Sequence, residues 1–266
     1  MASSYSNLHP VDQILTGLVQ EAVPSDNQLI ADKVFEQIKV PERSGTLLLE
    51  ETRNFMGAGA GLDLERAPGA SRASMGGFDR SSQTFMAKIY AASDSIAMED
   101  ILDSQYPGSE EQRLARKVSR VVKLAREKRA ADLLFGTANF NNDSSTNEFG
   151  GKFNAAGAEP LAYLHELKDT VFEAAHGINP DSLVMGRKLF RELARNPEVR
   201  GFVGTVGNGL ASGNRVLNDE VVLSVLRDVL GIPNIFVGQA RQDTAVPGAT
   251  SSESYIWTED SLFMGI

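Results

Sequence analysis

The sequence predicts an α+β fold in which helices cover a small sheet. Short apolar runs typical of buried strands, Ser182–Met185 and Ile235–Val237, alternate with amphipathic helical segments within residues 181–240. A long charged helical segment precedes this region, and a glycine-rich stretch between two strand-like runs precedes that helix. With 266 residues and 42% hydrophobic content, the chain is long enough to bury a sizeable core.

The first part of the chain is predicted to be extended. Residues 1–45 mix short apolar groups with prolines, a pattern too broken for a compact domain, and we expect them to form an N-terminal arm. Strand-like runs at Thr46–Glu50 and Gln83–Ala91 then bracket the glycine-rich stretch, which predicts a very long hairpin. A loop of that length is usually functional or ordered by a partner. The alternative is a disordered linker.

The clearest helix is predicted over Ser109–Phe135. Ser109 and Gln112 have the spacing of a capping box, and Gly136 can end the helix. One side of the helix forms an apolar stripe of Leu114, Val118, Val121, Val122 and Ala125. The other side carries a basic stripe of Arg113, Arg116, Lys117, Arg120 and Lys123. A solvated face is the simplest interpretation of these charges, and contact with neighbouring molecules or with nucleic acid is the alternative.

The C-terminal half of the chain alternates between helix and strand. Helices are predicted over Pro160–His176, over Arg187–Arg195 and over Asn218–Gly231, whose first residue is the N-cap. A weaker strand is expected at Val199–Val206, in addition to the two buried strands described above. The closing residues Ser254–Ile266 are predicted to form a strand that returns to the earlier domain.

The composition excludes several classes of protein. A formal net charge of -9 repels nucleic acid on average and gives no support to a histone-like or repressor-like binder. Because cysteine is absent, disulfides, thiolate metal sites and thiol nucleophiles are excluded. No apolar run approaches the roughly 20 residues that cross a bilayer, and residues 1–10 lack the pattern of a signal peptide. We therefore expect the protein in the cytoplasm.

The sequence offers no set of residues that predicts catalysis. Gly69, Ser71 and Ala73 approach the G-x-S-x-G nucleophile elbow, but the last glycine is missing and the segment is not a strand that turns into a helix. His165 and His176 lie about three turns apart on one predicted helix, too far for a shared metal. We therefore expect no catalytic residue, no cofactor and no metal.

Several segments resemble capsid subunits of tailed bacteriophages, in the order expected of them. NQLIADKVFEQIKVP, followed by SGTLLLEE, is similar to the arm and the first strand of the extended loop. Residues 66–103 resemble the remainder of that loop, and SEEQRLARKVSRVVKLAREKRAADLLFG resembles the long spine helix. NPDSLVMGRKLFRELARNPEVRGFVG and NDEVVLSVLRDVLGIPNIFVGQA resemble the axial domain. The family that the chain resembles is the Hong Kong 97-type major capsid protein.

This resemblance implies an α+β Hong Kong 97-type capsid fold and a structural role. The subunit would consist of an N-terminal arm at 1–45, an extended loop at 46–92, a peripheral domain at 93–180 and 241–266, and an axial domain at 181–240. Such subunits form hexamers and pentamers that build an icosahedral shell around double-stranded DNA. The protein would therefore not be an enzyme.

The resemblance also implies partners and a location. Further copies of the chain, a portal, a separate scaffolding protein and packaged double-stranded DNA are the expected partners, with a decoration protein as an optional one and no membrane. The protein would be assembled in the host bacterial cytoplasm and reside in the capsid of the virion. The extended-loop arginines Arg53, Arg66, Arg72 and Arg80 are expected at the assembly interface, and the basic stripe of the spine helix is expected on the inner face of the shell.

The sequence departs from the family pattern at both of its ends. Many relatives have a scaffold-like segment before the arm, whereas the arm here begins almost at Met1, which implies a separate scaffolding protein or a processed chain. The end at Ile266 is also abrupt for this family.

Two other functions compete with the phage capsid. An encapsulin-like nanocompartment has the same fold but encloses a cargo enzyme and no genome. A hydrolase that uses Ser71 or a pair of carboxylates belongs to a different class, and it would lose its activity when Ser71 is replaced.

Overall fold

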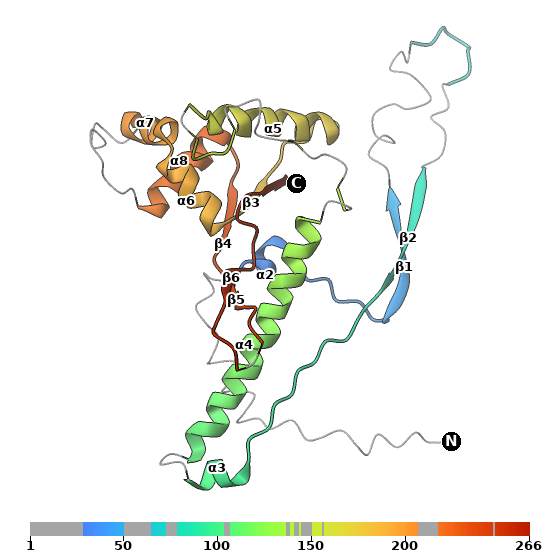
Figure 1. The fold of residues 1–266 in the computed structure, drawn as a ribbon. Helices are drawn as coiled ribbons and strands as arrows, with labels where there is room; N and C mark the ends of the chain where they lie inside the picture. The colour runs from blue at the N-terminus through green and yellow to red at the C-terminus, as the bar shows by residue number, and fades with distance from the viewer. Residues whose placement is uncertain are drawn as a thin grey trace, which may run out of the picture.

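The protein contains a long helix, a hairpin beside it and a helix-covered sheet near one end of the helix (Figure 1). Its mixed helix and strand content agrees with the α+β class expected from the sequence. A computed structural model describes residues 29–50, 65–72, 79–103, 107–136, 139–140, 144, 151–155, 157–206, 218–246 and 248–266.

The hairpin consists of β1 (Ser44–Glu50) and β2 (Arg80–Met86), which pair in antiparallel orientation over their full length. It stands to one side of the body in Figure 1. The predicted pairing of two strands is therefore confirmed, but β2 ends well before Ala91, where the sequence had placed its end. Most of the glycine-rich stretch that joins the two strands, residues 51–64 and 73–78, lies outside the described residues.

The structure describes three helices in the first half of the chain. The short helices are α2 (Ala31–Val34) and α3 (Met98–Asp103), and α4 (Pro107–Leu134) is the long one. With 28 residues, α4 extends about 42 Å at 1.5 Å per residue. The helix predicted over Ser109–Phe135 is confirmed with its ends displaced by one or two residues, a displacement expected for helix termini.

The buried face of α4 is not the one that the sequence pattern indicated. Val121 is 50% exposed and Val122 is 37% exposed, although both belong to the predicted apolar stripe. The buried apolar residues are instead Ala130, Ala131 and Leu134, near the C-terminal end of the helix. Small alanine side chains allow other segments to approach the helix closely, so Ala130 and Ala131 lie in the core although the larger Val121 and Val122 do not.

The central sheet has three strands in the order β4-β3-β7. Its middle strand, β3 (Ser182–Gly186), pairs in parallel with β4 (Asn234–Gly238) and in antiparallel orientation with β7 (Leu262–Gly265). The strands predicted at 182–185 and 235–237 are thus confirmed. The closing residues form two short strands rather than one, because β6 (Glu253–Tyr255) pairs separately with β5 (Arg241–Asp243) before the chain reaches β7.

Helices connect and cover the sheet. A parallel pair of strands requires a crossover, which here contains α6 (Arg187–Arg195), α7 (Pro197–Val206) and α8 (Asp219–Leu230) between β3 and β4. Helix α5 (Pro160–Ala174) precedes β3. Helix α8 ends as its sequence predicted, because Gly231 adopts a left-handed conformation with φ of 66° and its N–H bonds to a carbonyl of the last turn.

Helix α7 corrects the prediction of a weak strand at 199–206. Its valines, phenylalanine and threonine favour a strand when propensity alone is considered. The side chain of Asn196 overrides that preference by accepting a hydrogen bond of 2.8 Å from the backbone N–H of Glu198, and Pro197 is well suited to the first turn. Val199, which is only 1% exposed, then fixes the new helix to the core.

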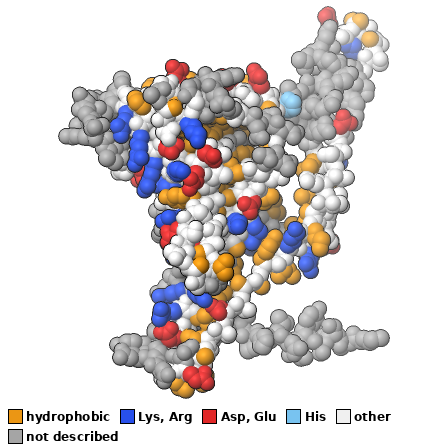
Figure 2. Space-filling view, viewed as in Figure 1, with side chains coloured by type: hydrophobic (Ala, Val, Ile, Leu, Met, Phe, Trp, Pro, Cys, Tyr) orange, Lys and Arg blue, Asp and Glu red, His pale blue; other side chains and the backbone are white. Residues whose placement is uncertain are grey.

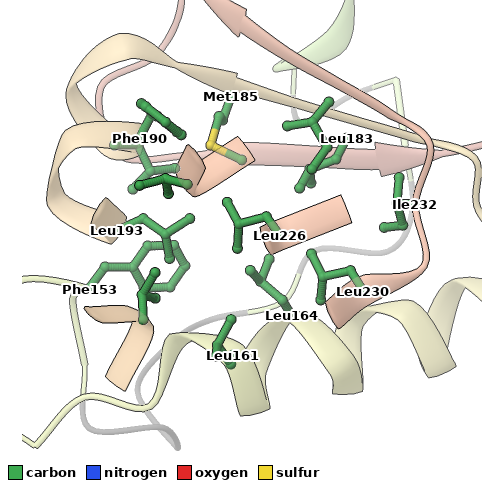
Figure 3. Close-up of a cluster of buried hydrophobic side chains, with 14 of the residues drawn as sticks. Phe153, Leu161, Leu164, Leu183, Met185, Phe190, Leu193, Leu226, Leu230 and Ile232 are labelled. Carbon is green, nitrogen blue, oxygen red and sulfur yellow. The ribbon is translucent and has the colours of Figure 1, made fainter. Parts of the chain in front are cut away.

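One face of the sheet lies in the larger apolar cluster (Figure 3). Leu183 and Met185 reach into it from β3, and Leu164, Phe190 and Leu226 come from α5, α6 and α8. All five side chains are fully buried. This cluster therefore holds the helices around the crossover against the sheet.

The opposite face of the sheet lies in a second cluster. Successive residues of a strand point to opposite faces, so Val184, between Leu183 and Met185, packs with Trp257 and with Ala131 of α4. Elements on both sides of the predicted domain boundaries at 180 and 241 share these clusters, since α5 and β7 pack with α6 and α8. The division into peripheral and axial domains stays a prediction.

Candidate functional site: the Glu127 junction

A buried carboxylate joins three distant segments of the chain. Glu127 lies on α4 and is only 2% exposed. One of its oxygens accepts a hydrogen bond of 2.7 Å from the backbone N–H of Ala31, and the other accepts one of 2.8 Å from Nε1 of Trp257. The N-terminal segment and the C-terminal segment are thus fixed to the same point of the long helix, and we call this arrangement the Glu127 junction.

The N-terminal contact of the junction uses the start of α2. The first N–H groups of a helix have no partner within the helix, and the carboxylate of Glu127 satisfies that of Ala31. Ile30 and Ala31 are 3% and 2% exposed, so this hydrogen bond is shielded from water. Beside it, Asp32 forms an ion pair of 2.6 Å with Arg126. That pair is largely exposed and contributes little by itself.

The C-terminal contact of the junction requires close packing around Trp257, the single tryptophan of the chain. Its ring is fully buried and meets the ring of Phe135 edge-on, with centroids 6.2 Å apart. Gly238 of β4 lies directly against the ring, because a Cβ atom at this position would be 2.2 Å from it. A glycine at position 238 therefore allows the indole to reach Glu127.

The electrostatics of the junction follow from its burial. Removal from water raises the pKa of the Glu127 carboxyl above its ordinary value, while the hydrogen bonds from Ala31 and Trp257 oppose this shift. The nearby charge of Asp32 raises the pKa further. The site can hold chain segments in place, since the hydrogen bonds of Ala31 and Trp257 to the carboxylate come from a backbone N–H and an indole N–H and not from a nucleophile.

Neither Glu127 nor Trp257 stands out in the sequence as a candidate site residue. The sequence contains a weak signal for a buried face of the helix. Glu127 shares one helical face with Ala130, Ala131 and Leu134, at spacings of three, four and seven residues. The position of Trp257, 130 residues away along the chain, could not be inferred from that pattern.

Two of the predicted extended-loop arginines, Arg66 and Arg80, form contacts within their own hairpin region. Arg80 pairs with Glu50 across the two strands at 2.8 Å, and Arg66 donates a hydrogen bond of 3.2 Å to the carbonyl oxygen of Ala70. Arg72 is exposed, and Arg53 lies outside the described residues. An assembly role for these arginines stays a prediction.

The basic stripe of α4 divides into paired and unpaired residues. Arg113 pairs with Glu110 at 2.9 Å, and Lys117 pairs with Asp94, a contact that lowers the pKa of the Asp94 carboxyl. The remaining members, Arg116, Arg120 and Lys123, form no ion pair with any residue that the structure describes. Their expected position on the inner face of a shell stays a prediction.

The residues considered for catalysis do not converge. Ser71 is exposed in an irregular segment rather than at a turn between a strand and a helix. His165 is exposed on α5, and His176, with φ of 56°, ends that helix in a left-handed conformation. Across the described ranges, no group of three or more His, Asp or Glu side chains could hold a metal ion. In the same ranges, no helix combines the length and the apolar character needed to cross a membrane.

Comparisons with known proteins find likeness at the level of structure. No protein-family model matches the sequence, and no curated protein matches it. The chain is similar to the crystal structure of a phage-related protein from Bordetella bronchiseptica, with a TM-score of 0.60, 20% identity, and coverage of 93% of this chain and 74% of that one. A structure from Microbacterium phage Oxtober96 has a TM-score of 0.46 and 14% identity, with 90% and 71% of the two chains covered. The first likeness shows that the chain shares its fold with a phage-related protein.

Proposed function

We propose that this chain is the major capsid protein of a tailed bacteriophage, a subunit of Hong Kong 97-type fold. Hexamers and pentamers of it form an icosahedral head that encloses double-stranded DNA. The β1–β2 hairpin is the observation that carries the proposal, because it is an ordered element without a core of its own. The long helix α4 and the fold shared with a phage-related protein support the same function. The role is structural, and no catalytic residue is assigned.

The hairpin exposes apolar side chains to water, which is unfavourable for an isolated subunit. Leu47, Leu48 and Leu49 are 50%, 66% and 46% exposed, and Met86 is 69% exposed. Hydrophobic side chains are visible at the surface along this part of the molecule in Figure 2. An isolated two-stranded hairpin is only marginally stable in water, and exposed apolar patches mark interaction sites. Contact with a neighbouring subunit in a shell would bury these leucines and offset the entropy lost on ordering the loop.

The inner face of the proposed shell would include those cations of α4 that form no ion pair with another described residue. Arg116, Arg120 and Lys123 suit weak, sequence-independent contacts with the phosphates of packaged DNA. Because the chain as a whole has a net charge of -9, these contacts would not be enough to bring DNA into the shell. Entry of the DNA would have to be driven by packaging through a portal. A separate scaffolding protein and a decoration protein are further proposed partners.

Electron microscopy of the purified protein tests the proposal. Negative staining should show closed particles that contain double-stranded DNA after infection or that are empty after expression alone. Deleting residues 57–77 should leave a folded subunit that does not assemble, since the deleted segment contributes to the neighbour rather than to its own core.

A milder pair of variants tests the leucines themselves. Leu48→Ser should raise the concentration needed for assembly and leave the melting of the subunit unchanged, because Leu48 is 66% exposed in the subunit. The control Thr46→Ser lies on the same strand and the same face of the hairpin and should assemble like the wild type. Normal shells from the deletion variant would exclude the assembly role of the loop. Particles that hold an enzyme and no DNA would identify a nanocompartment instead.

A further inference from the structure

Helix α5 carries an acidic outer face, formed by Glu166, Asp169 and Glu173. At 100° per residue these three positions fall within about 60° of one another, on the side opposite the buried Leu161 and Leu164. All three acids are exposed, and their carboxylates form no hydrogen bond or ion pair with any described residue. We call this surface the acidic face of α5.

The acidic face is unfavourable for the isolated helix. A helix C-terminus carries partial negative charge and favours cations. Helix α5 has no basic residue in its last turn and carries Glu173 there instead. Its own helix therefore gives no stabilisation to this carboxylate, whereas a cation from outside would.

Helix α6 carries a basic outer face, formed by Arg191 and Arg195. These arginines are exposed and lie opposite the fully buried Phe190 and Leu193. Neither one forms a hydrogen bond or an ion pair within the described part of the chain. Figure 2 shows Lys and Arg side chains gathered over the region of α6. We call this surface the basic face of α6.

Both charged faces lie on the outside of one packed unit. Both helices bury their apolar sides in the same cluster, where Leu161 and Leu164 enter from α5, and Phe190 and Leu193 enter from α6 (Figure 3). Because each charged face lies opposite its buried side, the two faces of one copy cannot meet. They can meet only between copies, in a head-to-tail contact that forms a ring when the rotation closes.

The charge spacing of the two faces also matches. Arg191 and Arg195 are four residues apart, and so are Asp169 and Glu173. Four residues correspond to about 6 Å along a helix axis, so two helices laid side by side can form two ion pairs at once. We infer that the basic face of α6 on one copy binds the acidic face of α5 on the next copy. The inference rests on the proposed function and deepens it, since it names the surfaces that join subunits within a ring.

Nucleic acid fits the basic face less well than a second copy does. The other cations of α6 are already paired with carboxylates, Arg187 with Asp219 and Lys188 with Glu259. These acids lower the positive potential around the face and would repel a polyanion. Two short ion pairs between the arginines and two carboxylates depend less on this lowered potential than binding of a long polyanion does. In addition, every copy of the chain supplies one acidic face for each basic face.

Charge reversal tests the contact. An acidic variant combines Arg191→Glu with Arg195→Glu, and a basic variant combines Asp169→Lys with Glu173→Lys. Each variant alone presents like charges on both faces, so its self-association, measured by sedimentation velocity at low salt, should require at least about tenfold more protein. An equal mixture of the two variants should recover association, because each face then meets its opposite. Added salt should weaken the wild-type association.

Controls separate this contact from other effects. The pair Lys128→Glu and Lys152→Glu changes the net charge by the same amount at exposed positions outside both faces and should associate like the wild type. Circular dichroism and thermal melting establish that every variant is folded. Wild-type association of either charge-reversal variant alone, or folded variants whose mixture does not recover, would overturn the inference.

The remaining outcomes are also decisive. An acidic variant that forms normal particles with less nucleic acid would assign the basic face to nucleic acid and overturn the inference. Because the measurement follows association of subunits rather than shell closure, a wild-type protein that associates but never closes into particles would count against the proposed function alone.

Discussion

Replacing Glu127 by alanine should strongly destabilise the protein. The change removes the acceptor of two buried hydrogen bonds, those from the backbone N–H of Ala31 and from Nε1 of Trp257. A buried donor without a partner costs about 1–3 kcal/mol, so two of them cost about 2–6 kcal/mol. Total stabilities of domains are only about 5–15 kcal/mol, and the loss is therefore large. It should also release the N-terminal segment, whose first helical N–H the carboxylate holds.

Two comparison variants separate the hydrogen bonds from other effects. Glu127→Gln keeps the shape and one carbonyl oxygen, but its amide nitrogen faces a second donor, so we expect about half the loss of the alanine variant. Glu111→Ala removes an exposed acid from the same helix and should stay within about 0.5 kcal/mol of the wild type.

Urea unfolding of the unassembled subunit, followed by the fluorescence of Trp257, measures these differences. The same probe reports the environment of the indole directly. An alanine variant that unfolds like Glu111→Ala, with unchanged emission of Trp257, would refute the account of the junction.

Four further predictions follow from the described contacts. The folded pKa of Glu127 lies above its ordinary value of 4.5, so the part of its stability contribution that is linked to this shift is fully present below that pH and is lost as pH rises through the folded pKa. The difference in unfolding free energy between the wild type and Glu127→Gln should therefore fall with pH over this window, and a flat difference contradicts the prediction. Gly238→Ala forces a Cβ atom against the ring of Trp257, so it should lower the free energy of unfolding by about 1–3 kcal/mol and the melting temperature by several degrees. An unchanged melting temperature would contradict this prediction. Leu226→Asp places a carboxylate at a fully buried position and should be insoluble, whereas wild-type solubility would show that this face is exposed. No lysine lies between Val40 and Ala87, so no amine on the loop can cross-link subunits, and shells boiled in detergent should give one band near 28.7 kDa rather than a ladder.

Local signals in the sequence predicted the helices and strands of the C-terminal half well. Asn218 begins α8 and Gly231 ends it, because an N-cap side chain and a left-handed glycine act through neighbouring backbone groups. At α7 the local signals misled, because the valines favoured a strand where the chain forms a helix. The decisive contact, from Asn196 to the N–H of Glu198, is also local, and the Asn-Pro pair could have indicated a helix start rather than only a helix stop.

The sequence by itself determined the mixed helix and strand class and the long helix. Only the tertiary structure decided which face of α4 is buried, because that depends on segments far away in the chain. The apolar stripe with Val121 and Val122 has the better local pattern, yet Ala130 and Ala131 are buried because their small side chains admit Ile30 and Trp257. The Glu127 junction has the same origin. A hydrogen bond between residues 130 apart cannot be predicted from the local sequence, since its two partners are brought together only when the chain is packed.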